Sequence, residues 1–265
     1  MSSSQGQGWD PDRYGQFETE RSQPFRDLAA LVEQEEALSV LDLGSGTGEL
    51  TAWLHRKLSA DETVGIDRSE AMINRAAVHA GDGVRFEHAE IEAFIDSQPN
   101  GVWPLVWSNA ALQWLPDHGT LIPRILELVA PTGQIAIQMP VNVDNPSHLI
   151  ARQLGTDPRF AASLDGYERK DTVRSPEWYA AMLHESGFTI QQISVQVYGH
   201  VLPETRSISD WVQGSLLTPY RERLSSETYS EFIEAYELRL IEQLGDHHPC
   251  FYPFKRLLIW GRRTI

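Results

Sequence analysis

The sequence predicts an α/β fold in which helices flank a mostly parallel β-sheet. Between residues 38 and 140, short apolar runs alternate with helical patterns at intervals of roughly 20 to 25 residues, as βαβ units do. The first apolar run leads directly into a glycine-rich turn. The chain has 265 residues, of which 41% are hydrophobic and 22% charged, so it is long enough to bury a core without disulfide bonds.

The elements of the first half follow from local patterns. Residues 38–43 are a short apolar run that ends at glycine, which is typical of a buried strand. Residues 21–36 repeat apolar side chains at the helical period. Ser69 is expected to cap a helix, since its hydroxyl can accept a free backbone N–H. The expected elements are a helix over 21–36, a strand over 38–43, a helix over 49–58, a strand over 63–67, a helix over 69–80, strands over 84–89 and 105–108, a helix over 121–129 closed by Pro131 and Gly133, and a strand over 134–139.

The regular alternation of strand and helix patterns ends after Pro140. Residues 141–176 are polar and carry Pro, Asp and Asn, and no regular element is predicted before a helix that opens at Ser175. We expect a flexible tail over 1–8 and a single domain over 9–265. The later elements are a helix to 186 ended by Gly187, a strand over 190–202, helices over 209–244 with breaks at Gly214 and Pro219, and a strand over 254–260; the expected core is 25–140, 187–202 and 252–263, with substrate or lid insertions at 141–186 and 203–251.

Composition excludes several classes of protein. Lys and Arg number 22 and Asp and Glu 37, which gives a net charge of −15 and a field that repels nucleic acids. A single cysteine, Cys250, rules out a disulfide framework and a Cys-rich zinc site, and we expect no metal. No apolar run approaches the length of a membrane span, and residues 1–8 lack the pattern of a signal peptide. We therefore expect a cytoplasmic protein that binds neither nucleic acid nor membrane, as a monomer or weak homo-oligomer.

The sequence of the glycine-rich turn indicates which of two classes of ligand it binds. A dinucleotide fingerprint needs a third glycine where this chain has Glu49, and a carboxylate there would repel a pyrophosphate. The run from Asp42 to Gly48 instead has the form D-x-G-x-G-x-G, which resembles motif I of the class I S-adenosylmethionine-dependent methyltransferases. That ligand carries an ammonium and a sulfonium, which Asp42 would attract. An NAD-dependent oxidoreductase and a non-catalytic cofactor-binding protein are the alternatives.

The resemblance to class I methyltransferases implies a Rossmann-like fold, a seven-stranded sheet and a helical lid inserted before the last strand. It implies that Asp67 accepts both ribose hydroxyls and that Glu90, where the family usually has Asp, faces the adenine amine. The run from Asn109 to Leu112 differs from the N/D-P-P-Y/F run of adenine amino-methyltransferases. The implied cofactor site is Asp42, Gly44, Ser45, Gly46, Asp67, Arg68, Met72, Glu90, Ile91, Asn109 and Trp114.

Seven segments outside this turn are not generic methyltransferase features: 9–14, 108–118, 138–140, 146–148, 198–202, 211–215 and 252–257. They resemble the trans-aconitate 2-methyltransferase family. Membership implies methyl transfer from S-adenosylmethionine to a carboxylate of trans-aconitate, which gives a monomethyl ester and S-adenosylhomocysteine. Gln23 and Thr218 depart from the pattern, because relatives often carry arginine there, and Val141 replaces a frequent aspartate. These departures leave a methyltransferase for another small molecule as the alternative, with a different acid or a carbon or oxygen nucleophile.

The implied reaction needs no catalytic acid or base. A carboxylate is already ionised at neutral pH, so its oxygen can attack without losing a proton. Proximity and alignment can supply roughly 7 to 11 kcal/mol of the barrier. A tricarboxylate within an acidic protein needs a local cluster of cations and hydroxyl donors. The candidates for that cluster are Tyr14, Arg21, His148, Tyr198, His200, Lys255 and Arg256, of which the adjacent Lys255 and Arg256 would point to opposite faces of a strand.

Overall fold

The computed structural model describes residues 18–264, with side chains described from Ser22 onward, and consists of two compact units. We call the first the sheet unit; it contains Ser22–Val141, Asp171–Gln196 and the residues from Lys255. The second, the helical unit, contains Asn142–Lys170 and Val197–Phe254. The expected tail over 1–8 lies outside the described residues, and the expected single domain with lid insertions stays a prediction.

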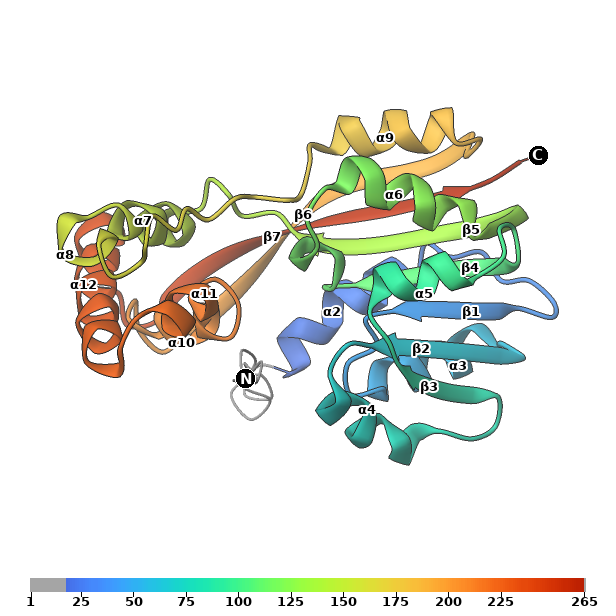
Figure 1. The fold of residues 1–265 in the computed structure, drawn as a ribbon, viewed down its shortest axis with the longest axis horizontal. Helices are drawn as coiled ribbons and strands as arrows, with labels where there is room; N and C mark the ends of the chain where they lie inside the picture. Colours follow the sequence, from blue (N-terminus) through green and yellow to red (C-terminus); the bar gives the residue numbers. More distant parts are fainter. Residues whose placement is uncertain (1–17, 265) are drawn as a thin grey trace, which may run out of the picture. The chain divides into compact units, whose positions relative to one another are not determined.

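Seven strands form one sheet, in the order β3-β2-β1-β4-β5-β7-β6 (Figure 1). Strands β1 to β5 pair in parallel, whereas β7 is antiparallel to β5. The mostly parallel seven-stranded sheet that the sequence predicts is thus confirmed, and the strand order reverses on the two sides of β1 and β4. The strands are β1 (Ser39–Leu43), β2 (Glu62–Asp67), β3 (Val84–His88), β4 (Trp103–Asn109), β5 (Val129–Pro140), β6 (Ile190–Leu202) and β7 (Cys250–Arg262).

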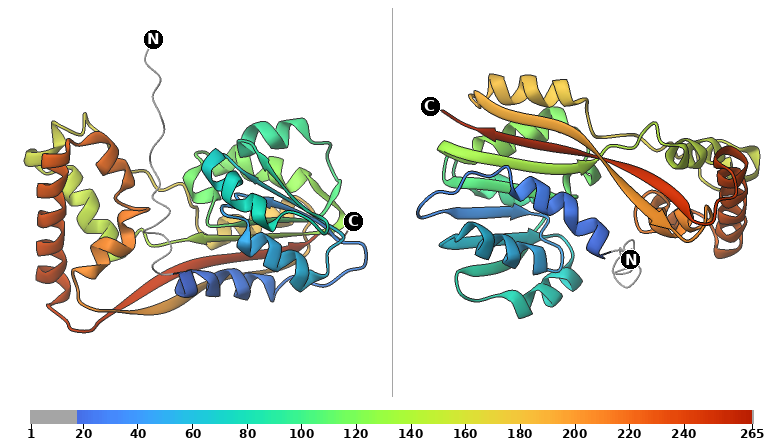
Figure 2. Two further views of the ribbon diagram at one scale, coloured as in Figure 1. Left: turned by 90° about the horizontal axis from the view of Figure 1, so that it is seen from below. Right: turned by 180° about the vertical axis from the view of Figure 1, so that it is seen from behind.

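Helices cover both faces of the sheet (Figures 1 and 2). On one face α5, α6 and α9 pack on the strands through side chains such as Phe94, Ile122 and Leu183. On the other, α2 and α3 do so through Phe25 and Leu54. Each fully buried apolar side chain contributes about 1.5 to 3 kcal/mol. The helical segments of this unit are α2 (Glu18–Ala29), α3 (Glu49–Leu58), α4 (Glu70–Ala76), η2 (Ala77–His79), α5 (Ile91–Ser97), η3 (Leu112–Trp114), α6 (His118–Glu127) and α9 (Pro176–Glu185).

The ends of two helices test the sequence prediction, which is confirmed for α4 and wrong for α6. Ser69 caps α4, and its hydroxyl accepts the N–H of Met72 at 3.4 Å. Pro131 and Gly133, expected to close a helix, lie inside β5 instead, because α6 ends at Glu127. The register between β4 and β5 shifts over this stretch, and an irregular pairing tolerates a residue without an N–H.

The helical unit is built around its own apolar core. Phe160 and Tyr220 pack against Phe232 with ring centroids 5.1 and 4.9 Å away. The polar stretch after Pro140 contains two helices that the sequence analysis missed. Asn145-Pro146 and Asp157-Pro158 begin them, so the residues taken as loop punctuation are N-caps followed by proline in the first turn. The helices are α7 (Pro146–Gly155), α8 (Pro158–Ala161), α10 (Ser207–Gln213), α11 (Thr218–Arg223) and α12 (Ser226–Leu244).

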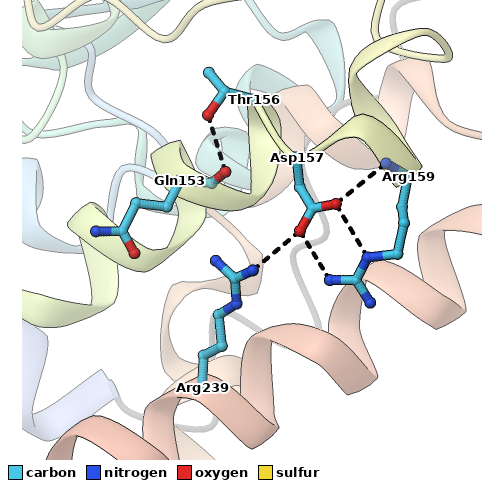
Figure 3. A network of polar contacts seen from close by, with 5 residues as sticks. All are labelled: Gln153, Thr156, Asp157, Arg159 and Arg239. Atoms are coloured by element: carbon cyan, nitrogen blue, oxygen red, sulfur yellow. Dashed lines mark hydrogen bonds and ion pairs between the residues drawn. The ribbon is translucent and has the colours of Figure 1, made fainter.

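Asp157 joins α8 to α12 inside the helical unit (Figure 3). Its carboxylate accepts the backbone N–H of Arg159 at 3.1 Å and the Arg159 guanidinium at 2.9 and 3.0 Å. Arg239 of α12 donates to the same carboxylate at 3.0 Å. Hydrogen bonds from Arg159 and the two positive charges lower the pKa of Asp157 to about 2. The start of the short α8 is therefore fixed to the long α12 by an ionised side chain.

Among residues 18–264, none of the helices has both the length and the apolar character that a membrane crossing requires.

Candidate functional site

The turn after β1 is a glycine turn, as the motif predicts. Gly44, Gly46 and Gly48 all have positive φ angles, of 90°, 56° and 77°. The N–H groups of Gly44 and Ser45 both donate to the carbonyl of Ile66 at 2.9 Å, which ties the turn to β2. A Cβ on Gly44 would lie 2.2 Å from the Cβ of Ala111, so only glycine lets these two loops approach. A Cβ on Gly46 would meet no atom within 4 Å, so the chain leaves space beside it.

Asp67 ends β2 beside this turn. Its Oδ2 accepts the N–H of Gly46 at 3.0 Å, and its Oδ1 accepts the N–H of Ser69 at 2.8 Å. These bonds fix the carboxylate, and a carboxylate with one bond per oxygen retains further acceptor positions. The geometry therefore fits the ribose diol that the resemblance implies, because a diol needs two adjacent acceptors. The role itself stays a prediction.

Asp42 lies inside the sheet unit and is only 2% exposed. Thr51 donates its hydroxyl proton to Asp42 Oδ2 at 2.6 Å. Burial raises the pKa of Asp42 to about 7; the Thr51 hydrogen bond opposes that rise, and the charge of Asp67 adds to it. Burial therefore favours the protonated form of this carboxyl, and a cation beside it would favour the ionised form.

Three polar side-chain atoms near this edge have no hydrogen-bond partner within residues 18–264. They are Ser45 Oγ after β1, Asn109 Oδ1 at the end of β4, and Gln138 Nε2 on β5, and each atom is buried. Asn109 and Gln138 face each other in the β4–β5 register. Buried polar atoms are rarely left unpaired, so this edge is suited to a polar ligand that supplies the missing partners.

The other predicted cofactor residues follow the carboxyl ends of neighbouring parallel strands. Arg68 and Met72 come after β2, Glu90 and Ile91 after β3, and Trp114 after β4, so the sheet topology brings them to one edge. Met72 and Ile91 are buried, whereas Trp114 is 39% exposed. Arg68 and Glu90 are exposed. Their individual roles stay predictions.

The predicted substrate residues are divided between the two units. His148, Tyr198 and His200 belong to the helical unit, and Lys255 and Arg256 to the sheet unit. Tyr14 lies outside the described residues, as does the side chain of Arg21.

Within the helical unit, two of the predicted histidines reach one aromatic cluster. The rings of His148 and His200 lie 6.3 and 6.5 Å from that of Phe254. His200 also packs on Trp211 at 4.1 Å and is buried, which excludes the possibility that it faces solvent.

Arg256 lies on β7, where it pairs with Pro140 of β5. Pro140 is two residues beyond Gln138, so Arg256 stands at the same edge of the sheet as Asn109. Both Lys255 and Arg256 are half-buried. A cation on β7 thus lies near the strand ends that carry the predicted cofactor residues.

His148 lies in the first turn of α7, not in the loop that the sequence suggested. The single hydroxyl proton of Ser147 goes to Asn145 Oδ1 at 2.9 Å, since an amide oxygen can only accept. Ser147 Oγ therefore accepts from Tyr252 at 2.8 Å and from His148 Nδ1 at 3.1 Å. His148 is thereby held with its proton on Nδ1, and its Nε2 is left for another partner.

Arg169 is a charged residue that the sequence analysis missed. Burial, together with the positive charges of Arg169 and Arg152, lowers the pKa of His148 to about 3. The Nε of Arg169 is buried and has no hydrogen-bond partner in the described part of the chain. In the sequence, Arg169 lies between Glu168 and Lys170 and looks like a surface charge, so no local pattern reveals it. An anion bound beside His148 would therefore be attracted by the positive charges of Arg169 and Arg152.

Comparison with known proteins identifies the family. A family model described as a methyltransferase domain matches residues 34–175. The trans-aconitate 2-methyltransferase of Deinococcus radiodurans is 35% identical over 261 residues, which cover 96% of this chain and 98% of that protein. The protein of the same name from Methylobacterium nodulans is 36% identical over 259 residues, which cover 97% and 98%.

Solved structures agree on the fold. A putative methyltransferase of Bacillus halodurans matches with a TM-score of 0.61 at 14% identity, and the match covers 92% of this chain and all of that one. A phosphoethanolamine N-methyltransferase of Haemonchus contortus in complex with S-adenosylmethionine matches with a TM-score of 0.54 at 14% identity, over 92% of this chain and 53% of that one. The sheet order and flanking helices are those of the class I methyltransferase fold. The chain belongs to the trans-aconitate 2-methyltransferase family and is an S-adenosylmethionine-dependent methyltransferase.

Proposed function

We propose that the enzyme transfers the methyl group of S-adenosylmethionine to a carboxylate of trans-aconitate, which gives the monomethyl ester and S-adenosylhomocysteine. The observation that carries the proposal is the similarity to proteins of that name, about 35% identity over nearly the full length of both chains. Local positive charge also supports it: Arg169 and Arg152 lie near His148, and Lys255 and Arg256 lie on β7. A tricarboxylate needs such residues within a chain of net charge −15.

When bound, S-adenosylmethionine supplies an electrophilic methyl group on a positively charged sulfur. In this proposal Asp67 accepts the ribose hydroxyls while the N–H groups of Gly46 and Ser69 hold its carboxylate in place. Asp42 balances positive charge at the other end of the ligand. Asn109 and the loop after it cover the side from which the acceptor approaches. None of these residues transfers a proton, because the attacking carboxylate is already ionised.

His148 and Arg169 contribute an anion-binding group in the helical unit, and Arg256 contributes a cation in the sheet unit. The pKa of His148, about 3, keeps its imidazole neutral in the free enzyme. A carboxylate next to Nε2 would favour the protonated ring and raise that pKa. Binding of the acid would then take up a proton, and its affinity would increase as pH falls.

Turnover tests the proposed acceptor. Formation of S-adenosylhomocysteine is measured with S-adenosylmethionine and each of a set of di- and tricarboxylic acids, trans-aconitate among them. We expect trans-aconitate to give the highest kcat/KM. An Asp67→Ala control, which loses the ribose contact, should be close to inactive and excludes a contaminating methyltransferase. If trans-aconitate gives no more product than a reaction without acid, the proposed acceptor is wrong.

A second candidate is methyl transfer to another small molecule. It is favoured by Gln23 and Thr218, which stand where relatives often have arginine. Gln23 is exposed and donates to Asp27 at 2.7 Å within the same helix, and Thr218 is buried and donates to the carbonyl of Gln213 at 3.1 Å. Both side chains thus make local bonds, and neither supplies a charge. A different acid as the best substrate in the same set would support this candidate.

A further inference from the structure

His118 is a buried histidine that the proposed reaction does not use. It begins α6, directly after the loop that follows β4, and its side chain has no exposure to solvent. Its Nε2 lies 2.9 Å from the carbonyl of Leu112, and its Nδ1 lies 2.5 Å from the hydroxyl of Tyr179. Tyr179 lies on α9 and is equally buried.

The hydrogen bonds of this group permit one arrangement of protons. The Leu112 carbonyl can only accept, so His118 carries its proton on Nε2 and donates there. The Tyr179 oxygen accepts the backbone N–H of Arg174 at 3.1 Å, and its own proton is then donated to Nδ1 of His118. The ring is therefore neutral. Burial, with Arg174 nearby, lowers the pKa of His118 against the opposing effects of the Leu112 hydrogen bond and of Asp117.

A second donor holds the same loop at the next residue along the chain. Thr172 Oγ1 donates to the carbonyl of Gln113 at 2.7 Å. The Gln113 side chain donates to the carbonyl of Ala110 at 2.6 Å. Three carbonyls of the loop, those of Ala110, Leu112 and Gln113, are thus bonded to side chains. One of these side chains, Thr172, comes from a segment that is distant in sequence, and Tyr179 of the same segment bonds to His118.

The loop so fixed is the one that the cofactor site depends on. Ala110 has a φ of +53°, an arrangement that an L-residue keeps only where the surroundings determine it. Ala111 packs so closely against Gly44 that no Cβ fits between them, and Trp114 ends the loop's short 3₁₀ turn. A displacement of the Leu112 or Gln113 carbonyl would therefore move Ala111, which packs against Gly44 of the glycine turn.

We propose that His118 and Thr172 are positioning residues that set the loop over 110–115 for cofactor binding, with His118 held in its tautomer by Tyr179. The inference rests on the proposed placement of S-adenosylmethionine at this edge of the sheet. It does not depend on which acid accepts the methyl group.

The experiment measures the Kd of S-adenosylmethionine by titration calorimetry for isosteric variants that delete one hydroxyl each. Tyr179→Phe removes the bond that orients His118, and Thr172→Val removes the bond to Gln113. We expect each Kd to rise about five- to tenfold, the effect of one lost hydrogen bond on an equilibrium.

Thr63→Val is the matched control. Thr63 Oγ1 lies 2.9 Å from Nδ1 of His55, so this variant also removes a buried hydroxyl–histidine bond in the sheet unit. Thr63 is near the amino end of β2, whereas Asp67 is at its carboxyl end. We expect Thr63→Val to lower the urea midpoint of unfolding as much as Tyr179→Phe does, with an unchanged Kd.

Two results overturn the inference: an unchanged Kd in folded Tyr179→Phe or Thr172→Val, or an equal rise in Thr63→Val. Thr172 is half-buried, so Thr172→Val decides the matter if Tyr179→Phe fails to fold. Asp67→Asn separates this inference from the placement of the cofactor. If Asp67→Asn also binds normally, the placement is wrong; if only Asp67→Asn loses affinity, the placement holds and the positioning role is wrong.

Discussion

Asp42 is a carboxyl group enclosed by the sheet unit, with one oxygen bonded to Thr51. The free enzyme therefore carries a group whose ionisation opposes folding at neutral pH. Such a group is retained where a ligand uses its charge, which agrees with an ammonium or sulfonium partner. The ionised form of Asp42 thus favours binding of a cationic ligand, whereas its protonated form favours the folded state.

The variant Asp42→Asn tests this opposition. Because the native pKa of about 7 lies above the ordinary 3.8, the proton stabilises the native state below pH 4, and that contribution is lost as the pH rises through 7. We expect Asp42→Asn to gain stability relative to wild type between pH 5 and pH 8, by about 3 kcal/mol, and to bind S-adenosylmethionine more weakly. Urea unfolding at both pH values measures the gain, with Asp61→Asn as an exposed control. A difference that does not change with pH would contradict the assignment.

Gly44 and Gly46 give a second test, since their surroundings differ. Gly44→Ala places a Cβ 2.2 Å from Ala111 and should destabilise the fold strongly. Gly46→Ala meets no protein atom, so only the strain of its positive φ applies, about 1 to 3 kcal/mol. We expect folded Gly46→Ala to lose S-adenosylmethionine binding, because the ligand needs that space. Normal binding by Gly46→Ala would show that the ligand does not approach this glycine.

Individual elements show what a sequence can predict. The elements over 49–58 and 190–202 were predicted with the bounds that the structure has, since apolar periodicity and flanking glycines act over short distances. The helices α7 and α8 were missed, because Asn-Pro and Asp-Pro are typical of loops as well as of helix starts. The tautomer of His118 and the position of Arg169 depend on residues distant in the chain, so no local pattern indicates them.

The start of α8 is an element whose stability should depend on pH. The pKa of Asp157 is lowered to about 2, so the ionised side chain stabilises the helical unit above the ordinary value near 4, and this effect is lost as the pH falls through 2. We expect Asp157→Asn, which keeps a capping amide but loses the charge, to be less stable than wild type at pH 6. At pH 2 the two proteins should be equally stable in urea. A stability difference that persists at pH 2 would rule out the ion pairs as its cause.

At the scale of the whole molecule, each unit has its own hydrophobic core, and that of the sheet unit consists of two clusters, one on each face of the sheet. The apolar clusters of the sheet unit and of the helical unit contain different residues. In the proposed function, the net charge of −15 confines binding of the acid to local positive groups such as Arg169 beside His148. The sequence indicates the charge but not the division, because two of the boundaries between the units fall within the strands β6 and β7.

Calorimetry tests the two cores. All of the predicted cofactor residues lie in the sheet unit, so S-adenosylmethionine should stabilise that unit directly. We expect two thermal transitions, of which saturating cofactor shifts one upward; a concentration of 100 times Kd corresponds to about 2.7 kcal/mol. The shift should be absent in Asp67→Ala. One transition that moves as a whole would show that the two cores unfold together.

The proposed methyl transfer to a carboxylate is tested most directly by the chemical form of the product. The enzyme is incubated with trans-aconitate and S-adenosylmethionine labelled in its methyl group, and the acid is analysed before and after treatment with alkali. We predict one labelled methyl group per acid, one S-adenosylhomocysteine per methyl, and release of all label as methanol, because an ester is cleaved by base. Label that resists alkali, or an acid recovered without label, would contradict transfer to a carboxylate.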